Sequence, residues 1–125
     1  MQEIRLLTNF DIDSYNALTV LFSGQESFTL RLGLSILESL ANSITININI
    51  ESLSKDETFA FIEKRINDCG NTNKLYTNNA LTLIHQSSGG ILRIINKIAS
   101  SSLLKAYFSK SSTIEAEHVK SAIER

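Results

Sequence analysis

The chain has 125 residues, of which 42% are hydrophobic and 20% are charged, and its formal net charge at pH 7 is -1. This length suits one compact domain, or one small domain joined to part of a neighbour, and it excludes two complete enzymatic domains. The near-zero net charge excludes attraction of the whole chain to nucleic acid or to anionic membranes. A DNA contact would therefore need a local basic patch or a partner.

Cysteine usage and hydropathy set the expected compartment. Cys69 is the sole cysteine, so the chain forms no internal disulfide and has no cysteine-based zinc site. The sequence begins with no basic-then-apolar signal pattern, and no apolar run approaches the ~20 residues of a membrane span. We therefore expect a cytoplasmic protein without a membrane span.

The first 52 residues show strand and helix patterns in alternation. Residues 1–10 have the apolar spacing of a helix end, and residues 17–22 form a continuous apolar run, typical of a strand buried in a parallel sheet. Apolar residues recur every four positions over residues 27–40, which predicts a helix. Residues 44–50 alternate isoleucine with threonine or asparagine, which predicts a half-exposed edge strand. This part is predicted to be α/β.

Beyond Leu53 the sequence predicts four helices. Ser54 and Glu57 form a capping box at the start of the first helix, and Thr77 caps the second. The third is predicted from Ile91 to Phe108. The fourth is predicted over residues 114–123, with Thr113 as its cap.

The segment that joins the second and third of these helices carries the most informative motif. Gly89 and Gly90 free the backbone at a helix start, and Arg93 lies in the first turn of that helix. The arginine side chain is a planar, permanently charged fork that matches phosphate oxygens, so the motif could place a positive group on a nucleotide. In the alternative interpretation the glycines are caps and Arg93 is solvated. Spacing alone favours this alternative.

A second candidate follows the predicted strand of residues 17–22. Polar groups at the carboxyl end of a parallel strand are where α/β sheets bind ligands. Gln25, or less favourably Ser23, could orient a water or a phosphate there. The alternative is an ordinary turn between a strand and a helix. His85 and His118 have no neighbours at metal-ligand spacing, so we predict no metal site.

Motifs for ATP hydrolysis are absent from the sequence. The chain contains no Gly-x-x-x-x-Gly-Lys-Ser/Thr loop, and no apolar run ends in a pair of acidic residues. Such loops hold the β- and γ-phosphates, and such acidic residues hold magnesium. We therefore expect no ATP hydrolysis by this chain alone.

The order of these elements, together with Gly89, Gly90, Arg93 and Asn96, resembles a known group of AAA+ ATPases. These are the ExeA-type ATPases of general secretion and their relatives that assist bacterial transposases. The resemblance extends from residues 6–10 to residues 117–119. It implies a fold of two remaining strands from a partial P-loop core, residues 1–52, followed by an all-α four-helix lid, residues 53–125.

The same resemblance implies roles for two residues. Gln25 would occupy the sensor-1 position, and Arg93 would be the sensor-2 arginine that reaches the γ-phosphate. ATP and Mg would be the ligands of the parent family. The implied partners are other AAA+ subunits or the missing core, and a transposase or secretion protein. The phosphate loop would then be encoded upstream of Met1, in an intact parent of which this chain is a fragment or truncated product.

The chain also departs from the family pattern. Glu26 and Leu92 stand where the family usually has proline, and Ser43 stands where it has an arginine. In the family that arginine acts as a finger on a neighbour's nucleotide, so the resemblance does not carry trans-activation over to this chain.

Three functions compete at this point. The first is a nucleotide-sensing lid of an ATPase that remodels a transposition or secretion partner. The second is a non-catalytic helical domain that binds a partner protein such as a transposase. The third is DNA binding through Lys105, Lys110 and Lys120, which is disfavoured because glutamates lie among these lysines.

Overall fold

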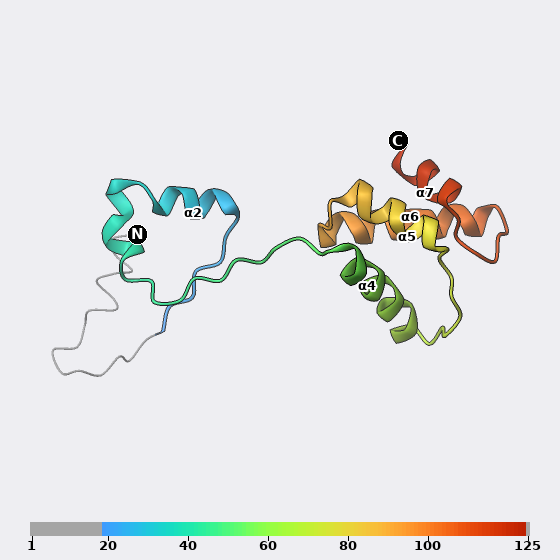
Figure 1. Ribbon diagram of the computed structural model, residues 1–125, viewed down its shortest axis with the longest axis horizontal. Helices are drawn as coiled ribbons and strands as arrows, with labels where there is room; N and C mark the ends of the chain where they lie inside the picture. The colour runs from blue at the N-terminus through green and yellow to red at the C-terminus, as the bar shows by residue number, and fades with distance from the viewer. Residues whose placement is uncertain (1–18, 125) are drawn as a thin grey trace. The chain divides into compact units, whose positions relative to one another are not determined.

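Residues 19–124 are described by the structure, a computed structural model shown in Figure 1. The chain divides into two compact units, Met1–Asn49 and Ile50–Arg125. The expected helix end within residues 1–10 lies outside the described residues, as do the first two residues of the strand predicted over residues 17–22. The roles predicted for the two parts stay predictions.

Three short helical segments follow one another in the N-terminal unit. They are α2 (Glu26–Leu32), the 3-10 helix η1 (Ser35–Leu37) and α3 (Glu38–Ala41). The prediction of one continuous helix over residues 27–40 is therefore wrong. The break falls at Leu34, whose φ of -75° and ψ of 140° are extended rather than helical, directly after Gly33, a residue that weakens a helix interior.

The predicted α/β fold is also wrong, because residues 19–124 contain no β-strand and are mainly helical. Residues 19–22 and 44–50 are non-helical, and neither segment pairs with a strand among the residues that the structure describes. Of the alternating isoleucines of the second segment, Ile44 is half-buried and the other three are exposed, with Ile46 at 76% and Ile50 at 89%. Alternation shows only which side chains share a face. A strand also needs a neighbouring strand whose backbone forms hydrogen bonds with its own. The described part of the chain is thus all-α.

The C-terminal unit contains four helices, as predicted. They are α4 (Lys55–Asp68), α5 (Asn78–Ser88), α6 (Leu92–Phe108) and α7 (Ala116–Ile123). Helix α5 contacts α4, α6 and α7, so it is the central helix of the unit. Between the helices, Ile114 forms an isolated parallel bridge with Tyr76.

Local capping explains where α4, α5 and α7 begin. Glu57 N–H donates to Ser54 Oγ at 3.3 Å, and Ser54 N–H donates to Glu57 Oε2 at 2.9 Å. Ala80 N–H donates to Thr77 Oγ1 at 3.3 Å. Both predicted caps are confirmed. The predicted cap of α7 at Thr113 is wrong, because Glu115 is the N-cap residue and its N–H donates to His118 Nδ1 at 3.0 Å.

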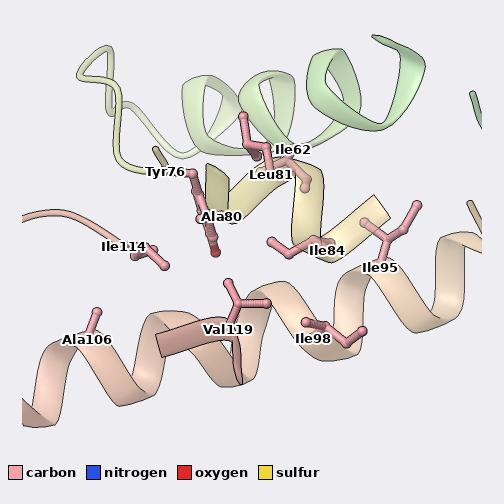
Figure 2. Packing of buried hydrophobic residues seen from close by; sticks show 10 residues of the cluster. All are labelled: Ile62, Tyr76, Ala80, Leu81, Ile84, Ile95, Ile98, Ala106, Ile114 and Val119. Carbon is pink, nitrogen blue, oxygen red and sulfur yellow. The ribbon is translucent and has the colours of Figure 1, made fainter. Parts of the chain in front are cut away.

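The core of the C-terminal unit lies around α5, as Figure 2 shows. Fully buried Leu81 and Ile84 of α5 meet Ile95 of α6 and Val119 of α7. Burying each such side chain contributes about 1.5–3 kcal/mol of transfer free energy. The remaining members of the cluster are Ile62, Tyr76, Ala80, Ile98, Ala106 and Ile114.

Tyr76 ties the loop after α4 to α6. Its hydroxyl donates to Ala99 O at 2.8 Å, and its side chain is buried. Burial raises the pKa of the Tyr76 hydroxyl, while a hydrogen bond with Ser102 opposes that rise. The phenol therefore stays protonated, and remains a donor, beyond the pH at which an exposed tyrosine ionises.

The capping box of α4 predicts a pH dependence of stability. Hydrogen bonds from the backbone and side chain of Ser54 hold the pKa of Glu57 below its ordinary value of 4.5. A carboxyl whose pKa is lowered by folding stabilises the fold above its unfolded pKa, and the contribution is lost as the pH falls through its folded pKa. Between about pH 6 and pH 3, we expect Glu57→Gln to lose less stability than the wild type.

The measurement is thermal unfolding, followed by circular dichroism, of both proteins at each pH. All other carboxyls titrate in both proteins, so the difference between the two curves reports the Glu57 carboxyl. Parallel curves for the two proteins over this pH range would show that the Glu57 charge does not stabilise the cap.

Candidate functional site

Two consecutive glycines connect α5 to α6. Gly89 has a φ of 58° and Gly90 a φ of 76°, both in the left-handed region that glycine adopts without steric cost. Gly89 N–H donates to His85 O at 3.0 Å and closes the end of α5. Because both residues are left-handed, the chain reverses within a few residues and α6 begins at Leu92.

The space around residue 90 also admits only glycine. The carbonyl of Gly90 accepts a hydrogen bond from Leu53 N–H at 2.9 Å. A Cβ built on Gly90 would lie 2.1 Å from Leu53 O, far closer than non-bonded atoms approach. A backbone hydrogen bond therefore joins the segment that precedes α4 to the turn at the start of α6.

Arg93 is the second residue of α6 and is exposed. The N-cap residue Ile91 provides no side-chain cap, and the first turn contains no acidic residue. The positive end of the helix dipole is thus uncompensated beside a guanidinium. The ion pair found within residues 19–124 joins Lys64 to Asp68, so Arg93 has no carboxylate partner there. The arrangement suits contact with an anion.

A buried polar contact joins α4 to α5 close to the two glycines. The Thr58 hydroxyl, which is fully buried, donates to Ser54 O at 2.8 Å and lies 3.0 Å from His85 Nδ1. The single hydrogen of the Thr58 hydroxyl is already donated to Ser54 O. His85 Nδ1 must therefore supply the hydrogen of its own bond to the hydroxyl. His85 itself is half-buried on α5. Its partner could not be predicted, because no sequence spacing relates positions 58 and 85.

Gln25, the other predicted site residue, belongs to the N-terminal unit. It is the N-cap residue of α2, is exposed, and its side chain forms no capping hydrogen bond. Arg93 belongs to the other compact unit, Ile50–Arg125. The sensor-1 role of Gln25 and the sensor-2 role of Arg93 stay predictions.

No group of three or more His, Cys, Asp or Glu side chains within residues 19–124 could hold a metal ion. No described helix combines the length and apolar character that crossing a membrane requires.

The C-terminal unit is thus a four-helix unit that presents an arginine beside a two-glycine turn. Over 107 residues, the chain is 33% identical to general secretion pathway protein A of Aeromonas hydrophila. The alignment covers 86% of this chain and 20% of that protein, so the chain spans about a fifth of its relative's length. No family model matches the chain. No solved structure matches it. The similarity supports the predicted ExeA-like relationship.

Proposed function

We propose that this chain supplies the helical lid of an ATPase of the ExeA type, with Arg93 as its contact to the terminal phosphate. The observation that carries the proposal is the position of Arg93, exposed at the uncapped first turn of α6 directly after Gly89 and Gly90. An arginine there combines a bidentate cation with the positive end of a helix, and both favour phosphate oxygens.

The backbone contact between Leu53 and Gly90 gives Arg93 a mechanical role in this proposal. A shift of the segment before α4 is transmitted to the start of α6 through a hydrogen bond of 2.9 Å. The orientation of the lid then depends on whether a phosphate is bound at Arg93. ATP and magnesium would be held by a phosphate loop and acidic residues that this chain does not contain. The chain supplies no hydrolytic step by itself.

The name of the relative favours a secretion partner over a transposition partner. Other subunits of the same ATPase, or its core, would adjoin the lid. The second candidate function is a helical domain that binds a partner protein without nucleotide. Exposed apolar side chains at the end of α6, including Tyr107 at 75% and Phe108 at 77%, favour this candidate.

The first test is a titration of fluorescent ATP, with magnesium, against the purified chain. We expect no saturable binding, because Arg93 is one arm of a site whose phosphate loop is absent from the sequence. Fluorescence anisotropy is the measurement. The contrary result would be saturable binding that is lost in Arg93→Ala. The chain would then hold nucleotide unaided, which would contradict the proposal that nucleotide binding depends on a separate core.

A further inference from the structure

The C-terminal half of α6 and the loop after it form a second candidate site. We propose that this surface binds an acidic amphipathic helix of a partner protein. We call it the α6 end surface, and it comprises Leu103, Leu104, Lys105, Tyr107, Phe108 and Lys110. The proposal does not involve Arg93 and stands apart from the proposed contact with phosphate.

Large apolar side chains are exposed together on this surface. Leu103 is 44% exposed, Leu104 57%, Tyr107 75% and Phe108 77%. Their spacing of one and four residues places them along one side of the helix, whereas Ser102 and Ala106 are buried. The rings of Tyr107 and Phe108 meet edge to face, with centroids 5.8 Å apart. Contiguous exposed apolar surface of this kind marks interaction sites in soluble proteins.

Phe108 lines two hollows of this surface. One hollow, of about 450 Å³, is lined by Tyr107, Phe108, Lys110 and two serines. Another, of about 210 Å³, includes Phe108, Leu104 and Lys105 in its lining and extends to Glu124 beyond α7. Each hollow thus combines an apolar wall with a lysine. A partner needs apolar groups for the walls and anionic groups for the lysines.

The stretch of sequence that supplies most of the lining of these hollows carries charge of one sign, and Glu124 of the smaller hollow lies outside that stretch. Residues 69–114 contain lysine or arginine at positions 74, 93, 97, 105 and 110, and no aspartate or glutamate. Neither Lys105 nor Lys110 forms an ion pair within residues 19–124. An uncompensated cation beside an apolar hollow is complementary to a carboxylate on a partner.

Lys110 is held in an uncommon backbone conformation. Its φ is 55°, the left-handed region in which the residue after a helix end is usually glycine. Ser111 N–H donates to Ala106 O and Lys110 N–H donates to Tyr107 O, both at 3.0 Å, which fixes this turn. A side chain kept at a strained position is a reason to look for a role. Here that side chain lines the larger hollow.

These features favour an acidic amphipathic helix over nucleic acid. Leucines and aromatic rings in a row match the apolar stripe of a helix laid in a groove, whereas phosphates gain nothing from exposed leucines. Carboxylates beside the apolar stripe of a partner helix would instead meet Lys105 and Lys110.

The test uses the full chain, labelled with ¹⁵N, and two synthetic helical peptides of roughly 18 residues. One has a leucine stripe flanked by glutamates, and the other has lysines in place of the glutamates. We expect saturable binding of the acidic peptide, with shifts centred on residues 103–111, and at least about tenfold weaker binding of the basic peptide. A short DNA duplex is titrated in parallel.

Exposed residues provide the matched variants, and circular dichroism checks that each is folded. Phe108→Ala should weaken binding of the acidic peptide about tenfold, and the double variant Lys105→Glu with Lys110→Glu should reverse the preference between the peptides. Lys74→Glu, which at a different hollow makes the same charge change as each of these two substitutions, should leave binding unchanged. Equal binding of both peptides, no saturable binding, or tighter binding of the duplex than of the acidic peptide would overturn the proposal.

Discussion

Replacing Gly90 with alanine is expected to destabilise the C-terminal unit by about 3 kcal/mol or more. Two costs combine at this position. A φ of 76° is unfavourable for any residue with a Cβ, and the new Cβ would lie 2.1 Å from Leu53 O. The neighbour is backbone, so it cannot turn away as a side chain would. Either the hydrogen bond from Leu53 N–H to Gly90 O breaks or the start of α6 moves.

The measurement is urea unfolding followed by circular dichroism, with Gly70→Ala as the control. Gly70 has a φ of 84°, and nothing lies within 4 Å of a Cβ built on it. Its replacement should therefore cost only about 1–2 kcal/mol, the backbone term alone. The difference between the two variants isolates the contact with Leu53. Equal losses in both variants would show that this contact is not tightly packed.

Helix boundaries in the C-terminal unit were predictable because they depend on neighbours within a few residues. Ser54, Thr77 and Gly89 act on groups at most four positions away. Such local hydrogen bonds can be recognised in a sequence. The cap at Thr113 was misplaced by two residues, because Glu115 takes that position and pairs its N–H with His118.

Strands were not predictable in the same way. The isoleucines of residues 44–50 alternate as they would on a half-buried strand, but no described segment pairs with that backbone. A strand depends on hydrogen bonds to a second segment, which the alternation of one segment cannot reveal. The helix expected over residues 27–40 failed at Leu34 for a local reason, the extended backbone after Gly33.

The candidate site was predicted only in part. The two glycines and Arg93 stood out in the sequence, and the structure places them in one turn and one helix start. The contact between Gly90 and Leu53 was not foreseen, since 37 positions separate these residues in the sequence. Neither was the α6 end surface, because helical periodicity does not tell which apolar residues a unit leaves uncovered.

Loss of the Arg93 guanidinium is the change expected to affect function most. If it contacts the terminal phosphate, its removal takes away a charged donor from a site where negative charge develops during phosphoryl transfer. Removal of one such donor slows turnover roughly a hundredfold. Lys97, an exposed cation one turn further along α6, provides the control. Its removal changes the net charge by the same amount.

The central claim is tested most directly by steady-state ATP hydrolysis of an ExeA-type ATPase in which this chain replaces the enzyme's own lid. Arg93→Ala is compared with Lys97→Ala and with the unmodified hybrid. The account predicts a loss of roughly a hundredfold in kcat for Arg93→Ala and little change for Lys97→Ala. A hybrid that hydrolyses ATP equally well with arginine or alanine at position 93 would contradict it.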